Sequence, residues 1–163
     1  MSKIKITFPD GAVKEFDKSV TGYQIAQLIS NRLAEEVLAV KFNNTVQDLH
    51  RTITEDGTVK FLTFDDLEGK EVYWHSSSHL MAHAVQNMFP EAKFGVGPAI
   101  DAGFYYDIDI NTQLSEDHLK IIEDKVWKPN NGTKHFLKIT QKRMTKNHSH
   151  KVLLVSVILL SWN

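Results

Sequence analysis

The stretch KIKITFPDGAVKEFDKSVTGYQIAQLI, residues 3–29, decides the fold of the first part of the chain. Polar and apolar residues alternate on both sides of a Pro-Asp-Gly turn at residues 9–11, and this pattern predicts a β-hairpin. Thr21 is placed to cap a helix with one buried face, whose apolar stripe is Ile25, Leu28, Ile29 and Leu33. A hairpin crossed by a helix therefore opens the chain.

Further short strands are expected beyond this helix, over residues 38–42, 46–49 and 58–64, with turns at Asn43-Asn44 and at residues 55–57. The order ββαβ with added strands is that of a β-grasp fold. We therefore predict a β-grasp domain over residues 1–64. A unit of about sixty residues lies near the lower limit for independent folding, so we expect it to accompany another domain.

The pattern changes after this first domain. A short charged stretch with one glycine, DDLEGK at residues 65–70, predicts a linker. Residues 71–88 contain no glycine or proline and predict a helix, whereas the aromatic stretch FYYDI at 104–108 predicts a strand. Ser115 is placed to cap a second helix, whose apolar face is Leu119, Ile122 and Val126. The fold class predicted for the whole chain is α+β.

The composition narrows the classes of protein that the chain can represent. Its 163 residues include no cysteine, which excludes a disulfide framework, a thiolate nucleophile and a thiolate metal site. No apolar run follows the basic residues at the N-terminus, so no secretory signal is expected. The longest apolar run, residues 152–160, is about half the length needed to span a bilayer. We expect a soluble, cytoplasmic chain without a membrane partner.

The charge is distributed unevenly, although the formal net charge is only −1. All 20 acidic residues lie at or before Asp124, whereas the last 38 residues hold six Lys and Arg143 and no acid. Uniform placement would put about five acidic residues in that segment. We therefore expect residues 126–163 to be a disordered basic tail, unrelated to what precedes it.

The densest cluster of reactive side chains is HSSSHLMAH, residues 75–83. On a helix, a spacing of four residues places His75, His79 and His83 near one face. Two such imidazoles can ligate a divalent metal or hold and polarise a water molecule, and the same spacing also occurs in ordinary surface pairs. A serine nucleophile is not favoured, since no GxSxG elbow is present, and the glycines at 95 and 97 complete no phosphate-binding loop.

Two segments resemble one family. MSKIKITFPDGAVKEFDKSVTGYQIAQLI, residues 1–29, resembles the TGS domain, a β-grasp module that opens bacterial threonyl-tRNA synthetases. WHSSSHLMAHAVQNMFPEAKFGVGPAIDAGFYYDID, residues 74–109, resembles the start of the editing domain in the same enzymes. TGS domains also occur in certain GTPases and in guanosine tetraphosphate enzymes, so the combination is more specific than either half. The resemblance covers residues 1 to about 125, with 71–125 matching an incomplete editing domain.

The resemblance implies an activity and a set of site residues. Family members attach threonine to its tRNA with ATP, and their editing domain hydrolyses seryl-tRNA. An HxxxH pair of the family matches His75 and His79, which would orient or activate the attacking water and are the residues that a metal would use. Tyr106 matches a tyrosine of the editing pocket, and Gly97 lies in the loop beside it. His83 is not part of the family pair.

The sequence also departs from the family. The family's CxxxH pair is missing because the chain has no cysteine, and the aminoacylation core, with its ATP motifs and zinc site, is missing as well. We therefore expect an N-terminal fragment that is inactive by itself and holds no cofactor, since ATP, Mg²⁺ and Zn²⁺ serve the core. Threonine tRNA would be a partner through the parent enzyme, and uncovered apolar surface would favour self-association.

Alternatives stay open for both the tail and the function. A frameshift near codon 125 would account for the acid-free tail, and a divergent but genuine C-terminus is the other explanation. The chain could also be a free-standing TGS module that binds RNA or a small ligand. A third reading is a trans-acting hydrolase of seryl-tRNA, in which His75 and His79 act without their cysteine partners.

Overall fold

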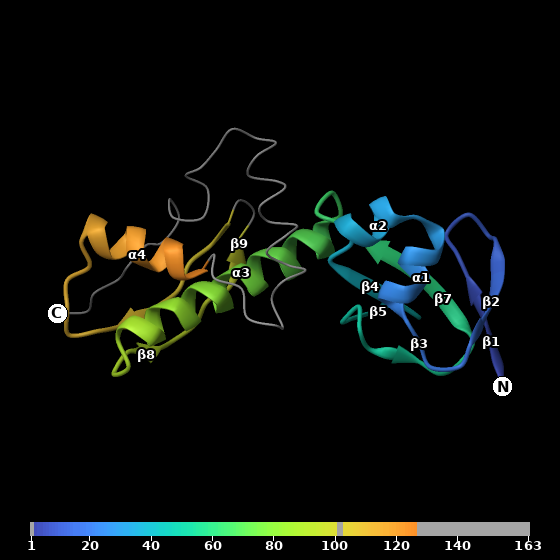
Figure 1. Cartoon of the computed structure of the whole chain (residues 1–163), viewed down its shortest axis with the longest axis horizontal. Helices are drawn as coiled ribbons and strands as arrows, with labels where there is room; N and C mark the ends of the chain where they lie inside the picture. The colour runs from blue at the N-terminus through green and yellow to red at the C-terminus, as the bar shows by residue number, and fades with distance from the viewer. Residues whose placement is uncertain (1, 101–102, 127–163) are drawn as a thin grey trace. The chain divides into compact units, whose positions relative to one another are not determined.

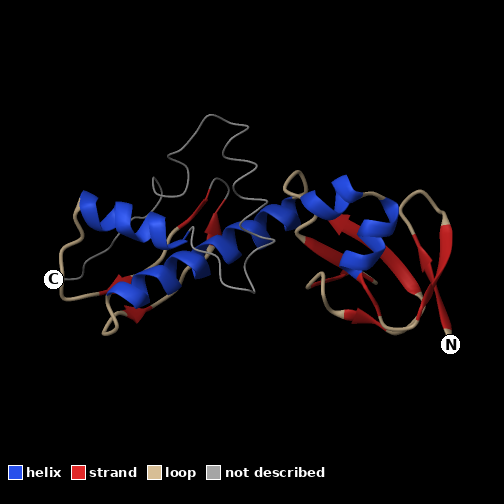
Figure 2. Ribbon diagram, viewed as in Figure 1, coloured by secondary structure: helices blue, strands red, loops and turns tan. Residues whose placement is uncertain are grey.

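A computed structural model describes residues 2–100 and 103–126 of the chain (Figure 1). The predictions for the basic tail, including its apolar run at 152–160, lie outside the described residues. The chain divides into two compact units, Met1–Val72 and Tyr73–Asn163. Helices and strands are mixed in both, which confirms the α+β class (Figure 2). No helix of the described part of the chain combines the length and the apolar character needed to cross a membrane.

The first unit is built on a five-stranded sheet. Its strands are β1 (Lys3–Thr7), β2 (Val13–Asp17), β4 (Ala39–Phe42), β5 (Thr45–Gln47) and β7 (Gly57–Leu62), in the order β2-β1-β7-β4-β5. β1 and β7 are parallel, whereas the other neighbours are antiparallel. Since parallel strands need a crossover, the chain between them must pass over the sheet, and the helices lie in that connection. This is the predicted β-grasp arrangement.

The predicted turns at residues 9–11 and 43–44 are present, whereas Gly57 of the turn predicted at 55–57 is the first residue of β7. Gly11 has a φ of 81°, and Asn43 and Asn44 have φ values of 46° and 66°, which favour glycine and asparagine in tight hairpins. The Asn43 side chain also accepts a hydrogen bond from the Thr58 backbone N–H at 2.9 Å, so the β4–β5 turn is tied to the neighbouring strand β7. Local turn chemistry therefore set the register of this half of the sheet.

The predicted single helix is wrong in one respect, because the structure has two. Thr21 caps α1 (Gly22–Ile29) as predicted, through reciprocal bonds with Gln24. Ser30 then adopts extended backbone angles, ends α1 through its N–H and caps α2 (Asn31–Glu36) through its side chain. The buried face of α1 is formed by Gly22, Ile25 and Ala26, so Leu28 and Ile29 of the predicted stripe are 72% and 41% exposed.

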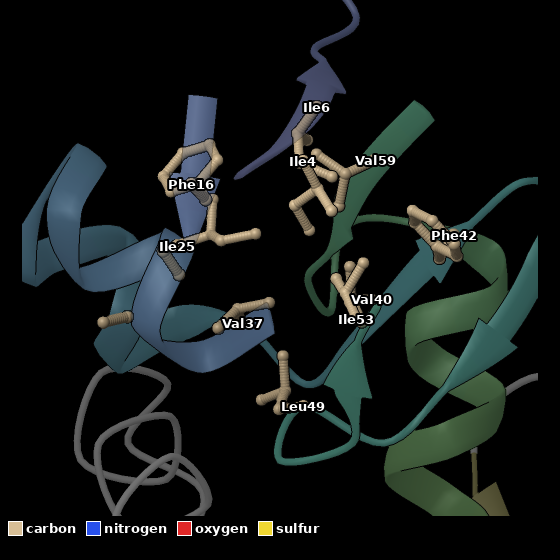
Figure 3. Close-up of a cluster of buried hydrophobic side chains, with 12 residues drawn as sticks. Ile4, Ile6, Phe16, Ile25, Val37, Val40, Phe42, Leu49, Ile53 and Val59 are labelled. Atoms are coloured by element: carbon tan, nitrogen blue, oxygen red, sulfur yellow. The ribbon is translucent and has the colours of Figure 1, made fainter. Parts of the chain in front are cut away.

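The core of the first unit lies between these helices and the sheet (Figure 3). A small second ladder, β3 (Val20–Thr21) with β6 (Thr52–Ile53), adds Ile53 to it. Each large side chain removed from water contributes about 1.5–3 kcal/mol. The core residues are Ile4, Ile6, Phe16, Ile25, Ala26, Ala34, Val37, Val40, Phe42, Leu49, Ile53 and Val59.

The long helix α3 (Leu67–Met88) begins four residues before the predicted start at residue 71, so most of the expected linker 65–70 is helical. Its first turn packs on the first unit: a Cβ on Gly69 would overlap the Thr63 backbone carbonyl. The Thr63 N–H also donates to the Asp66 carboxylate at 2.9 Å. The glycine that indicated a flexible linker is therefore required for close backbone approach.

Two carboxylates at the start of α3 compensate a like-charge pair on the sheet. β4 and β7 place Lys41 directly opposite Lys60, an arrangement that is unfavourable by itself. Glu68 lies 2.8 Å from the Lys41 ammonium, and Asp66 lies 2.7 Å from that of Lys60. The hydrogen bond from Lys60 holds the pKa of Asp66 below its usual range, and the same bond raises the pKa of Lys60.

In the second unit, α3 is accompanied by α4 (Glu116–Val126) and two short ladders. The ladders pair β8 (Lys93–Phe94) with β11 (Ile108–Asp109), and β9 (Ala99–Ile100) with β10 (Gly103–Phe104). The predicted strand 104–108 is therefore divided between two ladders.

The cap predicted for the second helix of this unit is confirmed. The His118 N–H donates to the Ser115 hydroxyl at 3.4 Å, and the Ser115 carbonyl accepts the Leu119 N–H at 3.1 Å. Ile122 and Val126 are buried, as their spacing predicted, whereas Leu119 is half-buried. Sequence spacing was sufficient here because the cap and the buried face are both local features.

Candidate functional site

His75 and His79 meet on α3. Their Nε2 atoms are 3.0 Å apart, and the rings stand at 89° with centroids 4.5 Å apart. A hydrogen bond at that distance requires one Nε2 to carry a hydrogen and the other to accept it. Both side chains are exposed and thus accessible to water and to a substrate. The predicted pairing at a spacing of four is therefore present.

The pair is presented by a helix whose opposite side is buried. The buried residues of this stretch of α3 recur at helical spacing, so the histidines between them face solvent. They are Tyr73, Trp74, Ser77, Ser78, Met81, Ala84 and Val85. Packing on one face of the helix is thus what exposes the two imidazoles on the other.

His83 does not join the pair. Its Nδ1 lies 3.4 Å from the side-chain nitrogen of Asn87, one turn further along α3. Within residues 2–100 and 103–126, no three or more His, Asp or Glu side chains gather in a way that could hold a metal ion. His75 and His79 by themselves offer two nitrogen ligands, which is fewer than the three or four protein ligands of a typical zinc site.

The serines between the histidines bond to the backbone. The Ser77 hydroxyl donates to the Tyr73 carbonyl at 2.8 Å, and the Ser78 hydroxyl donates to the His75 carbonyl at 2.7 Å. Both side chains are buried, so neither hydroxyl lies open to a substrate. This supports the interpretation of Ser77 and Ser78 as helix-stabilising residues rather than nucleophiles.

Gly97 and Tyr106 are also in contact. A Cβ added to Gly97 would lie 2.5 Å from two carbons of the Tyr106 ring, so the glycine backbone rests on the face of that ring. Phe94 meets the same ring edge-on, with centroids 5.8 Å apart. Tyr106 is itself buried. Glycine at position 97 is therefore explained by close approach to an aromatic ring.

A β-bulge places Gly97 on this ring. The Gly95 N–H donates to the Asp107 carbonyl at 2.8 Å, while the Asp107 N–H donates to the Val96 carbonyl at 3.1 Å. Two residues of one strand thus stand opposite a single residue of the other. The extra residue shifts the chain beyond β8. Such bulges are common beside functional sites because they redirect side chains.

Ser78 contacts one residue of each pair, His75 of the histidine pair and Gly97 of the Gly97–Tyr106 pair. Besides the His75 carbonyl, its hydroxyl contacts the Gly97 carbonyl at 3.4 Å. The sequence predicted no individual role for Ser78, because nothing in it distinguishes three consecutive serines. A helical projection would have placed Ser78 on the buried side, but which loop covers that side is a matter of tertiary structure.

Known proteins are similar to part of this chain. The TGS domain family matches residues 4–63, so the first unit is a TGS domain with its β-grasp fold. The threonine--tRNA ligase of Parabacteroides distasonis is 58% identical over 106 residues, which cover 65% of this chain and 16% of that protein. The corresponding ligase of Cytophaga hutchinsonii is 50% identical over 124 residues, 76% of this chain and 19% of that protein.

A third relative has a similar identity and coverage. The threonine--tRNA ligase of Porphyromonas gingivalis is 56% identical over 112 residues, which cover 69% of this chain and 17% of that protein. The aligned segments thus make up less than a fifth of each of these relatives. The chain is similar to the N-terminal part of threonine--tRNA ligases.

Proposed function

We propose that this chain acts as the N-terminal part of a threonine--tRNA ligase and carries one half of a site that hydrolyses seryl-tRNA. The observation that carries the proposal is the contact of 3.0 Å between the exposed imidazoles of His75 and His79. We assign Gly97 and Tyr106 to the same site because the Ser78 hydroxyl, in the helix turn that carries the histidines, contacts the Gly97 carbonyl, and Gly97 rests on the Tyr106 ring.

The chemistry suits an ester. A neutral imidazole takes a proton from water as the oxygen attacks the ester carbonyl, and the departing ribose hydroxyl then receives a proton. The second imidazole keeps the first in one tautomer through the shared hydrogen bond. Hydrolysis answers a discrimination problem, since a binding site for threonine cannot strongly reject a smaller analogue by contacts alone.

The remaining catalytic residues, the cofactors and the tRNA-binding surface would come from other parts of a ligase. The 163 residues contain no cysteine, so the family's CxxxH half-site is absent from them, and we expect no hydrolysis by this chain alone. ATP, Mg²⁺ and Zn²⁺ would serve the aminoacylation core. Threonine tRNA would be bound by the assembled enzyme in the cytoplasm.

A hybrid ligase tests the proposal. Residues 1–126 of this chain would replace the matching segment of the Cytophaga hutchinsonii enzyme, which aligns over 124 residues. The hybrid should hydrolyse seryl-tRNA, and His75→Ala or His79→Ala should lower the rate by about 10²-fold or more, the range of general acid–base catalysis. Threonine attachment should continue in all variants.

His83→Ala is the matched control, since it removes an exposed imidazole from the same helix and should leave hydrolysis unchanged. A hybrid that attaches threonine but does not hydrolyse seryl-tRNA would exclude the proposed role. Hydrolysis by the unmodified 163-residue chain, lost in the His75 and His79 variants, would instead identify a trans-acting hydrolase.

Self-association is the second part of the proposal. Large apolar side chains are exposed in both units, and the most exposed are Val13, Leu28, Leu67 and Val96. Exposed apolar surface favours contacts between copies. Light scattering of the purified chain should give a mass above 18.6 kDa that rises with concentration. A constant monomer mass would contradict this part.

A further inference from the structure

Ser78 is a buried side chain that contacts both the turn of α3 that carries His75 and the loop that carries Gly97. We propose that Ser78 is a positioning residue for the hydrolysis of seryl-tRNA. Its hydroxyl keeps the loop that carries Gly97 at a set distance from the turn of α3 that carries His75 and His79. This inference rests on the proposed function and assigns a role to a residue that touches neither the substrate nor the attacking water.

The contacts of the hydroxyl carry the argument. Ser78 Oγ lies 2.7 Å from the His75 carbonyl oxygen and 3.4 Å from that of Gly97. A hydroxyl has one proton, so the Gly97 contact is the longer branch of a shared hydrogen bond. The side chain is 0% exposed, so the hydroxyl does not face bulk water. Removing the oxygen leaves the Gly97 carbonyl without this donor.

The backbone around Gly97, which Ser78 contacts in the loop, has little conformational freedom. Gly97 rests on the Tyr106 ring, and the bulge at Gly95 and Val96 fixes the backbone that leads to it. A shift of the Gly97 carbonyl therefore moves either the glycine against the ring or the ring itself. Ser78 thus sets where Tyr106 lies relative to α3.

The other contact of the Ser78 hydroxyl lies within α3, in the turn that bears both histidines. The His75 carbonyl accepts from Ser78 within the same turn that brings His79 under His75. One side chain thus contacts the backbone of His75 and the backbone of Gly97. Positioning of this kind matters because misplacement of catalytic groups by about 1 Å can cost up to about 10²-fold in rate.

Ser77 provides a matched control in the adjacent position. It is 1% exposed, and its hydroxyl donates to the Tyr73 carbonyl at 2.8 Å, within α3. Ser77→Ala and Ser78→Ala therefore remove the same atom from equally buried positions on one helix. They differ in the contact with Gly97, which belongs to Ser78.

The first test uses the full 163-residue chain and nuclear magnetic resonance. The Gly97 α-protons lie over the Tyr106 ring, so their resonances should be displaced by the ring current. Ser78→Ala should move them toward ordinary glycine values and accelerate exchange of the Gly95 amide about fivefold, the factor expected for one hydrogen bond. Ser77→Ala should change neither. Unchanged Gly97 resonances in Ser78→Ala would overturn the proposal.

The second test uses the hybrid ligase. Ser78→Ala should lower kcat for hydrolysis of seryl-tRNA about fivefold and leave KM within about twofold, because positioning of the water is affected and binding is not. Ser77→Ala should keep both constants. Ser78→Cys, which keeps a weak donor of similar size, should fall between wild type and Ser78→Ala.

The outcomes separate the two proposals. If the wild-type hybrid hydrolyses seryl-tRNA and Ser78→Ala keeps its full kcat, the positioning role is excluded while the proposed function stands. If the wild-type hybrid does not hydrolyse seryl-tRNA, the proposed function fails and the positioning role fails with it. If kcat falls equally in Ser77→Ala and Ser78→Ala, both hydroxyls act by stabilising the helix, and the positioning role of Ser78 is excluded.

Discussion

The two units of the chain use β-structure very differently. The first joins five strands into one sheet and closes twelve buried residues beneath two helices. The described part of the second has strand pairs of two residues each, beside α3 and α4. A sheet of three or more strands with a hydrophobic face can be stable by itself, whereas an isolated two-stranded ladder is marginally stable. We infer that the first unit carries most of the stability and the second the candidate chemistry.

The largest expected effect comes from opening the core of the first unit. Ile25→Ala removes a side chain that is fully buried and should cost about 2–5 kcal/mol of unfolding free energy. No tryptophan lies in residues 1–72, so tryptophan fluorescence does not report directly on the first unit. Urea unfolding should therefore shift when followed by far-ultraviolet circular dichroism but not when followed by tryptophan fluorescence.

Leu28→Ala, on the same helix but exposed, serves as the control and should change the free energy by less than about 0.5 kcal/mol. An equal shift of both signals in Ile25→Ala would break the comparison, because the two units would then unfold as one cooperative body.

The next effect concerns the contact between the first turn of α3 and the sheet. Gly69→Ala places a methyl group against the Thr63 backbone carbonyl, which cannot rotate away, and should cost about 1–3 kcal/mol. Glu71→Ala, at an exposed position of the same helix, should be nearly neutral. Thermal unfolding measures both variants. A fully stable Gly69→Ala would mean that the helix does not need this close approach.

A smaller effect is expected at the junction of α1 and α2. Ser30→Ala removes the side-chain oxygen that accepts the Leu33 N–H at 3.0 Å and should cost about 1 kcal/mol. Ser30→Asp, which can still cap, should keep most of the stability. Loss of equal size in both variants would assign the effect to packing rather than to capping. Urea midpoints from circular dichroism distinguish these outcomes.

The smallest effect depends on pH. Since Lys60 lowers the pKa of Asp66 in the folded state, the pair stabilises the first unit above the ordinary aspartate pKa of about 3.9. That contribution is lost as the pH falls through the lowered value. Partly exposed pairs contribute about 1 kcal/mol or less. Asp66→Asn should therefore lower stability slightly at pH 7 and leave it nearly unchanged at pH 2. A loss of equal size at both pH values would contradict the assignment.

The sequence predicted the local parts of both units well. The hairpin, the asparagine turn, the Thr21 cap and the contact of His75 with His79 all depend on residues within a few positions of one another. Such features follow from backbone preferences and helical spacing, which a single sequence displays. The errors were of another kind: a helix continued through Ser30, a linker at 65–70 and an unbroken strand at 104–108.

Two of these errors come from short-range contacts that the hydrophobic pattern does not display. Ser30 caps a second helix, so the helical pattern does not continue through it. Gly69 lies against the Thr63 backbone carbonyl, which requires a glycine there without a linker. Residue propensity does not show such cases because the deciding contact depends on the backbone conformation that the fold selects.

By itself, the sequence determined the caps and the spacing of the histidine pair, because these depend on near neighbours in the chain, and its order of predicted elements indicated the β-grasp class of the first unit. The tertiary structure alone decided that Gly97 rests on Tyr106 and that Ser78, rather than Ser77, reaches the loop that carries Gly97. The physical reason is close packing. Which of two equivalent buried hydroxyls meets a second carbonyl depends on the loop that covers the helix, and that loop is placed by the whole unit.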